Sequence, residues 1–129
     1  MAQEPTEPAR RLLIVDDDEA LLRHMSVALG RLLTCPIDQF NDGNRAVDSA
    51  KTIAYAAAVL DMDMPALDGI ALARALREID GELPIFFVTG SSREVSPAEL
   101  DSIAPIEVIA KPVKPTVLAE KLRPFCSER

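Results

Sequence analysis

The residues with the clearest chemical potential are aspartates that directly follow apolar runs. The run Leu12–Val15 ends on Asp16–Asp18, and the run Ala56–Leu60 ends on Asp61. Carboxylates that follow buried strands lie at the carboxyl ends of an open parallel sheet, where ligands bind. Two such clusters side by side would form an oxygen-rich site that suits Mg²⁺. An aspartate held beside Mg²⁺ is a candidate to accept a phosphoryl group, and we expect Asp61 to be that residue.

A hydroxyl and an ammonium follow two further apolar runs. Thr89 comes directly after Ile85–Val88, and Lys111 comes directly after Glu107–Ala110. If Asp61 is the nucleophile, each of these groups can contact a phosphoryl oxygen and stabilise the charge of the transition state. We therefore predict a catalytic set of Asp61, Thr89 and Lys111.

The same strand ends supply oxygen ligands for the predicted Mg²⁺ cofactor. We expect Asp16, Asp17 and Asp61 to bind the metal, together with a main-chain carbonyl near Asp63, while water fills the other positions. Asp18 has a different expected role, because an aspartate just before a helical pattern is a favourable helix cap.

Five apolar strands alternate with five amphipathic helices along the chain. Five βα units in a row require a parallel sheet with right-handed crossovers and helices on both faces. The commonest arrangement for that count is a flavodoxin-like, doubly wound α/β fold with strand order 2-1-3-4-5. Its switch point brings Asp16 and Asp17 next to Asp61. The predicted strands are 12–15, 36–40, 57–60, 85–88 and 107–110.

Local signals mark the ends of the predicted helices. Asp17 or Asp18 caps the first helix, the turn Asn41–Gly43 precedes the second, and Gly81 stops the third. The segment Ser96–Glu99 begins a short fourth helix with a Ser cap, Pro at the first position and Glu three residues after the cap. The apolar side chains expected to face the core are Leu21, Met25, Ala28, Leu29, Leu32, Ala46, Val47, Ala50, Ile53, Ile70, Ala73, Leu76, Ile79, Leu118, Leu122 and Phe125.

Composition narrows the class of protein. The 129 residues and 48% hydrophobic content suit one globular domain, expected over residues 11–126 with a flexible leader at 1–10 and a tail at 127–129. A net charge of -7 argues against direct nucleic-acid binding. No apolar run approaches the roughly 18 residues of a membrane span, so we expect a cytoplasmic protein without membrane contact. There Cys35 and Cys126 are expected to be two reduced thiols with a structural role.

Four short motifs occur in order at the strand ends described above. They are Leu-Ile-Val-Asp-Asp-Asp at 13–18, Leu-Asp-Met-Asp-Met-Pro at 60–65 followed by Asp68-Gly69, Val-Thr-Gly at 88–90, and Lys-Pro at 111–112. Together these motifs make the chain resemble the receiver domain of two-component response regulators, the CheY-like phosphoacceptor fold. The resemblance extends from Arg11 to about Phe125.

The resemblance implies that a sensor histidine kinase or a histidine phosphotransfer protein phosphorylates Asp61 in an Mg²⁺-dependent phosphorelay. By motif, Asp16 and Asp17 match the acidic pair of the metal site, and the carbonyl of Asp63 matches its main-chain ligand. It also implies a cis bond between Lys111 and Pro112. A signalling change is expected through the fourth helix, last strand and last helix, a surface that can also support a homodimer.

Two departures from the family pattern concern the output of the signal. Val108 stands where the family usually carries an aromatic residue, and its β-branched side chain has no ring to swing inward. Pro124 truncates the usual last helix. We therefore expect the output to rely on the loop Gly90–Ser96 and on the short fourth helix.

The leading prediction is a signalling switch with self-catalysed acceptor chemistry and no turnover of a metabolite. A haloacid-dehalogenase-type phosphohydrolase would use Asp61 as nucleophile and Asp63 as general acid/base, but such enzymes place the nucleophile after the first core strand. A degenerate receiver would bind a partner without phosphorylation, and the complete acid, Thr and Lys set argues against it. We expect His24 on the surface and Met62 and Met64 in loop packing.

Overall fold

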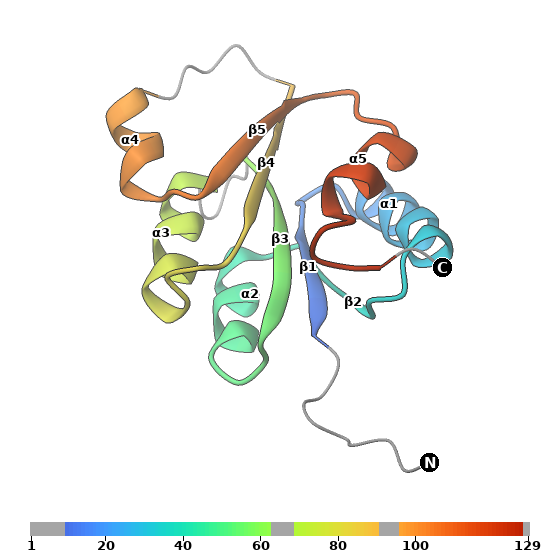
Figure 1. Ribbon diagram of the computed structural model, residues 1–129, viewed down its shortest axis with the longest axis horizontal. Coiled ribbons are helices and arrows are strands. Elements are labelled where there is room, and N and C mark those ends of the chain that lie inside the picture. Colours follow the sequence, from blue (N-terminus) through green and yellow to red (C-terminus); the bar gives the residue numbers. More distant parts are fainter. Residues whose placement is uncertain (1–9, 63–68, 91–95, 128–129) are drawn as a thin grey trace.

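The structure is a computed structural model that describes residues 10–62, 69–90 and 96–127. In these ranges five strands form one parallel sheet in the order β2-β1-β3-β4-β5 (Figure 1), which confirms the predicted fold class. The elements are β1 Arg11–Val15, α1 Glu19–Leu32, β2 Ile37–Phe40, α2 Gly43–Ala50, β3 Tyr55–Asp61, α3 Gly69–Ile79, β4 Ile85–Thr89, α4 Pro97–Ser102, β5 Ile106–Ala110 and α5 Pro115–Leu122.

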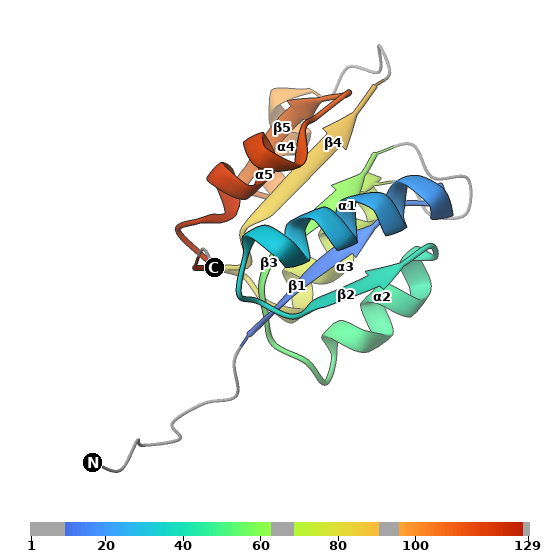
Figure 2. The ribbon, with the colours of Figure 1, turned by 90° about the vertical axis from the view of Figure 1, so that its right-hand side faces the viewer.

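Different helices cover the two faces of the sheet. α1 and α5 lie on one face, and α2, α3 and α4 lie on the other (Figure 1, Figure 2). Alternate side chains of a strand point to opposite faces, so Leu13 and Val15 of β1 enter one core cluster. Leu12 and Ile14 enter the other cluster, together with side chains of α1 and α5. β3 is buried along its whole length, as expected for a central strand covered on both faces.

The capping signals predict the helix starts correctly. Asp18 is the N-cap of α1, and its Oδ1 accepts a hydrogen bond of 3.1 Å from the Leu21 N–H. Ser96 and Glu99 form the predicted capping box at the start of α4. These side chains satisfy backbone donors that have no partner inside the first turn of a helix. Among the helices of residues 10–62, 69–90 and 96–127, none has the combined length and hydrophobicity of a membrane-spanning segment.

Some predicted core positions are wrong. Leu21 and Ile79 are each 40% exposed, whereas the neighbouring Leu22 is buried at 5%. A period of 3.6 residues leaves open which of two adjacent leucines faces the sheet, and the packing of α1 selects Leu22. Ile79 is the last residue of α3, and Ile53 lies beyond the end of α2 although it still packs against the core.

The last helix is shorter than the apolar pattern suggests. α5 ends at Leu122, close to Pro124, which has no N–H to donate to a helix. Phe125 therefore does not continue the buried face of α5 and is 42% exposed. Its ring makes an edge contact with Phe86, with ring centroids 6.1 Å apart.

The prediction of two reduced thiols is wrong for this structure. Cys35 and Cys126 form a disulfide, with their Cα atoms 5.7 Å apart. The two cysteines are 91 residues apart in the chain, so spacing alone gives no sign that they meet. They meet because the connection between α1 and β2 lies beside the segment that follows α5. The structural role expected for both cysteines agrees with this position.

Candidate functional site

Three of the predicted acidic ligands meet where the strand order of the sheet reverses. β1 and β3 are neighbours, with Val15 opposite Leu60, so the residues that follow them emerge side by side. Asp16, Asp17 and Asp61 each offer a carboxylate oxygen, and these oxygens all lie within 4.8 Å of one another. A hard, oxygen-only donor set of this kind fits Mg²⁺.

Lys111 points into the same cluster from the end of β5. Its Nζ lies 3.3 Å from Asp61 Oδ1. Its backbone N–H donates a hydrogen bond of 2.8 Å to the carbonyl of Thr89, which joins the ends of β4 and β5. The peptide bond between Lys111 and Pro112 is cis, as the resemblance implies. The structure thus brings Lys111 to Asp61 and places Thr89, which is half-buried, at the end of the adjoining strand.

Burial and charge work together at these carboxylates. Asp61 is only 4% exposed, whereas Asp17 is open to solvent. Burial raises the pKa of Asp16 to about 6, and the negative charge of Asp61 acts in the same direction. The Asp18 N–H, 2.9 Å from Asp16 Oδ1, and the Lys111 ammonium oppose that rise. Repulsion among the carboxylates is what a bound divalent cation would relieve.

A glycine at the start of α3 permits the backbone at the end of β3 to lie where it does. A Cβ atom on Gly69 would lie 2.7 Å from Met62 Cα and 2.9 Å from the Asp61 carbonyl oxygen. The Gly69 N–H also donates a hydrogen bond of 3.2 Å to the Met62 carbonyl. Met62 is fully buried, in agreement with its predicted packing role. The supporting role of Gly69 was not predicted, because only the folded chain brings these atoms together.

A cavity that the sequence did not predict opens beside the acidic cluster. It measures about 380 Å³ and lies between the sheet, α1 and α5. Asp16, Asp61 and Lys111 contribute to its lining, and most of the other lining side chains are apolar, among them Met25 and Leu118.

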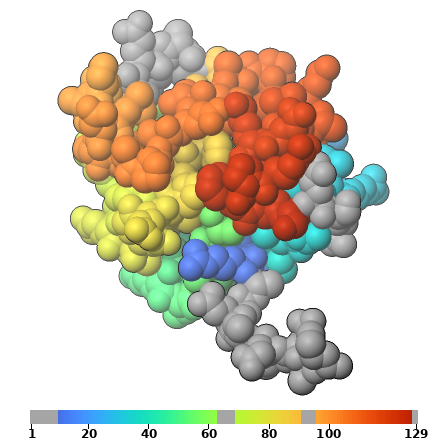
Figure 3. Space-filling view, in the orientation of Figure 1, coloured from blue at the N-terminus to red at the C-terminus, as the bar shows by residue number. Residues whose placement is uncertain are grey.

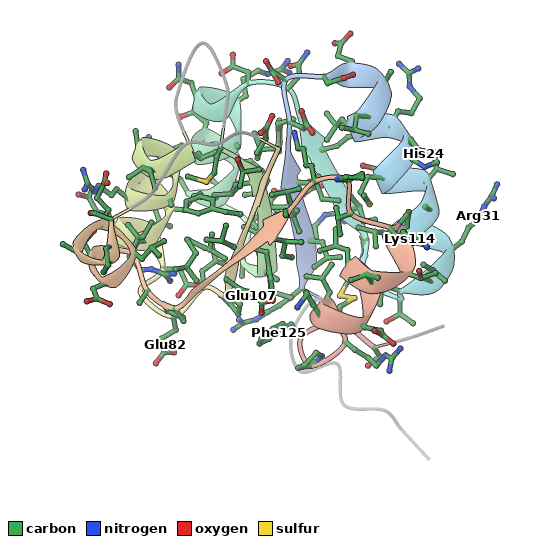
Figure 4. All side chains as sticks on the ribbon, turned by 90° about the horizontal axis from the view of Figure 1, so that it is seen from above. His24, Arg31, Glu82, Glu107, Lys114 and Phe125 are labelled. Carbon is green, nitrogen blue, oxygen red and sulfur yellow. A yellow bond between two sulfur atoms is a disulfide. The ribbon has the colours of Figure 1, made fainter. Side chains whose placement is uncertain are left out.

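Two further predictions concern residues around the site. Asp63, whose carbonyl was predicted to bind the metal, lies outside the described residues, as does Met64. His24 is exposed on α1 (Figure 4), which agrees with its prediction as a surface residue.

Comparisons with known proteins agree with this architecture. The family model of the response regulator receiver domain matches residues 12–123. The transcriptional regulatory protein PrrA of Mycobacterium leprae is 36% identical over 112 residues, which cover 85% of this chain and 46% of PrrA. The response regulator receiver protein CpdR of Brucella abortus is 30% identical over 103 residues, covering 80% of this chain and 85% of CpdR.

A solved structure shares the fold. The receiver domain of the sensor histidine kinase PA1611 from Pseudomonas aeruginosa, solved with a magnesium ion in its active-site cleft, superposes with a TM-score of 0.72 at 24% identity. The match covers 92% of this chain and 98% of that domain.

The strand order, the acidic cluster and the family match define a CheY-like receiver domain, a signalling domain of two-component systems. The chain belongs to the response regulator receiver family. It spans slightly less than half the length of the PrrA relatives that it matches. The phosphohydrolase alternative is not favoured, because the curated relatives and structural neighbours are receivers and response regulators.

Proposed function

We propose that Asp61 is the phosphoacceptor of this receiver. The observation that carries the proposal is the position of its nearly buried carboxylate, 3.3 Å from the Lys111 ammonium and grouped with Asp16 and Asp17. The Asp61 carboxylate thus has the Lys111 ammonium on one side and the candidate metal ligands Asp16 and Asp17 on the other. Both features favour attack on a negatively charged phosphoryl group.

The transfer itself makes one bond and breaks one bond. A carboxylate oxygen of Asp61 attacks phosphorus, and the bond between phosphorus and a histidine nitrogen of the donor protein breaks. The product is an acyl phosphate on Asp61, and the released imidazole of the donor takes up a proton from solvent to become a neutral histidine. The Lys111 ammonium contacts a phosphoryl oxygen, and the Thr89 hydroxyl donates to another, which stabilises charge as it spreads over these oxygens.

The residues that would hold Mg²⁺ are Asp16, Asp17 and Asp61, with the carbonyl of Asp63 as the main-chain ligand that the family resemblance implies. The grouping of three carboxylates supports this assignment, and the PA1611 receiver has magnesium in its own cleft. When bound, the cation would neutralise charge on the carboxylates and on the phosphoryl oxygens. Asp16 holds one oxygen toward the Asp18 N–H, which orients its carboxylate for this role.

The donor in this proposal is a sensor histidine kinase or a histidine phosphotransfer protein, and the output surface is formed by α4, β5 and α5. In the space-filling view these elements, coloured orange to red, form one continuous surface (Figure 3). Val108 and Val117 are 43% and 40% exposed on it. We propose that this surface binds a partner or a second copy of the chain.

One side chain anchors the far end of α4. The Arg77 guanidinium of α3 donates hydrogen bonds of 2.9 Å to the Ile103 carbonyl and 3.0 Å to the Pro105 carbonyl. Burial lowers the pKa of Arg77, but the group stays protonated at neutral pH. Because the end of α4 is held in this way, we expect phosphorylation to move its beginning, next to the loop Gly90–Ser96. Most of that loop lies outside the described residues.

The assignment of Asp61 is tested by labelling with radioactive acetyl phosphate and Mg²⁺. The wild-type protein should carry a hydroxylamine-sensitive label, and Asp61→Asn should carry none while keeping a similar melting temperature, because the amide is nearly isosteric with the carboxylate. Asp48→Asn, which changes an exposed carboxylate of α2, is the matched control and should label normally. A label that persists in Asp61→Asn would sink the assignment.

The same experiment separates the competing functions. Continuous release of phosphate over many turnovers would indicate a phosphohydrolase, and a wild-type protein that never labels would indicate a binding domain without phosphorylation. The proposal requires instead that the protein becomes labelled and that this label decays without sustained turnover. The expected absence of direct nucleic-acid binding concerns this domain and stays a prediction, because the whole PrrA protein is named a transcriptional regulator.

A further inference from the structure

The disulfide between Cys35 and Cys126 joins two distant parts of the chain. Cys35 lies in the connection between α1 and β2, and Cys126 lies after α5. In Figure 1 the red segment that follows α5, described up to Ser127, runs toward the connection between α1 and β2. The bond therefore connects the ends of the two helices that cover one face of the sheet.

Hydrogen bonds hold the same two segments together. The backbone N–H and the hydroxyl of Thr34 both donate to the Ser127 carbonyl, at 2.8 and 3.1 Å. Cys126 is 3% exposed and belongs to the core cluster that contains Leu29 and Leu122. The C-terminal segment is thus packed against the end of α1 by one covalent bond, a few hydrogen bonds and one small buried side chain.

The opposite ends of these helices are less closely packed. The cavity of about 380 Å³ lies there, lined by Leu21 and Met25 of α1 and by Leu118 of α5. The side chains that line this cavity lack the dispersion contacts that they would make in a closely packed interior. α1 and α5 share a core cluster that contains Leu29 and Leu122, and the cysteines add a covalent link at one end of that contact.

We propose that Cys35 and Cys126 form a reversible redox site, a latch that fixes the end of α5 to α1 when oxidised and releases it when reduced. This proposal goes beyond the phosphoacceptor function and does not depend on it. The reductant is a dithiol, either a small molecule or a protein, and the oxidant is the corresponding disulfide.

The two sulfur atoms have unequal surroundings, which assigns them different roles in the exchange. Cys35 is half-buried and Cys126 is buried, so an incoming thiolate reaches Cys35 Sγ. Attack there forms a mixed disulfide at Cys35 and breaks the bond to Cys126, which leaves as a thiolate. The Cys35 N–H lies 3.0 Å from Cys126 Sγ and would stabilise that thiolate.

A second step completes the reduction. The second thiolate of the dithiol attacks the dithiol sulfur that is bound to Cys35 in the mixed disulfide. Cys35 is released and takes up a proton to become a thiol, and Cys126 also takes up a proton. The dithiol loses two electrons and two protons and becomes a disulfide, and the protein disulfide becomes two thiols. Oxidation of the protein follows the same steps in reverse.

The test equilibrates the full chain in mixtures of reduced and oxidised dithiothreitol, followed by alkylation and mass spectrometry. The proposal expects one transition between zero and two free thiols. Glutathione disulfide added to the reduced protein should give a trapped adduct at Cys35 in the Cys126→Ala variant, and far less adduct at Cys126 in Cys35→Ser. Two free thiols in excess oxidised dithiothreitol, or equal adducts at both positions, would overturn it.

Measurements of thermal stability and amide hydrogen exchange test whether the disulfide acts as a latch. A disulfide that closes a loop of this length should raise the melting temperature by roughly 10 °C over the reduced protein. Reduction should also increase amide exchange roughly tenfold or more in residues 31–36 and 119–127, with little change in β3. If neither the melting temperature nor the amide exchange pattern changes between the oxidised and the reduced protein, no latch exists.

Matched variants separate this inference from the phosphoacceptor function. Cys35→Ser, at the less buried of the two positions, should melt like the reduced wild type and lose all dependence on dithiothreitol. Asp61→Asn should keep the full thiol transition, since it leaves both cysteines intact. Loss of the transition in Asp61→Asn, or its retention in Cys35→Ser, would contradict the proposal.

Discussion

At the scale of single residues, the position of Lys111 decides how charge is balanced around Asp61. Its ammonium lies 3.3 Å from Asp61 Oδ1, and Asp16 and Asp17 complete the cluster. Three carboxylates face one ammonium, so the cluster has an excess of negative charge before any phosphoryl group or metal arrives. The ammonium therefore attracts a phosphoryl group but repels a divalent cation.

Replacing Lys111 with Met, which keeps an unbranched stem and removes the charge, should separate these two effects. Labelling by acetyl phosphate should slow by roughly 10²–10³-fold, because one stabilising contact to the transferred group is lost. Mg²⁺ should bind more tightly, as measured by its effect on the melting temperature. Lys114→Met changes an exposed lysine nearby and is the control. An unchanged labelling rate would mean that Lys111 does not contact the phosphoryl group.

A second residue-scale feature lies away from the site, where β1, β2 and β3 meet. Arg11 donates to both carboxylate oxygens of Asp38, with Nη2 2.7 Å from Oδ1, and the Tyr55 hydroxyl donates to Oδ2 at 2.8 Å. Burial acts to raise the pKa of Asp38, but the hydrogen bonds from Arg11 and Tyr55 outweigh it and leave this pKa lowered. Burial raises the pKa of Tyr55 to about 12, so its hydroxyl stays protonated and can donate.

The lowered pKa of Asp38 predicts how stability depends on pH. Because the folded pKa lies below the unfolded value of about 3.9, this stabilisation is present above about pH 4 and is lost as the pH falls through the folded pKa. Asp38→Asn should lower the free energy of unfolding by about 1–3 kcal/mol at neutral pH. Measured by urea denaturation, the difference in free energy of unfolding between Asp38→Asn and the wild type should become smaller in acid. The control Asp48→Asn should have little effect on stability. A deficit of equal size at every pH would contradict this account.

At the scale of elements, the start of α3 supports the end of β3. Gly69 lies against the Asp61 carbonyl and Met62 Cα, and both of these contacts are backbone atoms that cannot rotate away. The strand end that carries Asp61, the proposed phosphoacceptor, therefore depends on a glycine at the first position of the next helix. Gly90 has a milder version of this role, because a Cβ there would lie 3.4 Å from the Lys111 side chain.

Gly69→Ala should consequently move the end of β3. We expect a loss of about 1–3 kcal/mol in the free energy of unfolding, together with slower labelling of Asp61, because the added methyl group requires a backbone shift. Gly81→Ala is the control, since a Cβ there meets nothing within 4 Å and its φ is not positive. That change should be neutral or slightly stabilising. Denaturation and labelling of both variants check the prediction, and equal behaviour would refute it.

At the scale of the whole molecule, the parallel sheet collects groups from three strand ends at one edge. β1 contributes Asp16 and Asp17, β3 contributes Asp61, and β5 contributes Lys111, although these residues lie up to 95 positions apart in the numbering, from 16 to 111. Folding must hold the three carboxylates together against their mutual repulsion. Any cation that binds only the folded arrangement therefore stabilises the whole fold.

Mg²⁺ should for this reason raise the melting temperature of the protein. At a free concentration ten times the dissociation constant, the gain is about 1.4 kcal/mol, or several degrees. Asp17→Asn removes the most exposed of the three carboxylates and should reduce the shift, whereas Asp48→Asn should leave it unchanged. Differential scanning fluorimetry can measure this, and a melting curve that millimolar Mg²⁺ leaves unaltered would count against the site.

Local sequence signals were enough to predict the order of the elements and the residues at the strand ends. These features depend on signals within a few residues: apolar runs for the strands, a 3.6-residue period for the helices, and caps such as Asp18 and Ser96. Once five βα units are recognised, the handedness of their connections leaves few possible sheets, so Asp16 and Asp61 could be placed together in advance. The cis bond before Pro112 followed from the family resemblance and is present.

The packing of the elements against one another could not be predicted from such local signals and became visible in the folded chain. It selected Leu22 over Leu21 as the buried leucine of α1, left Phe125 exposed, and joined Cys35 to Cys126. It also brought Gly69 against the end of β3. Each of these features depends on contacts between different elements. Local sequence patterns carry the propensity of each segment, but the rotation of a helix and the meeting of residues 91 positions apart arise from packing across the whole chain.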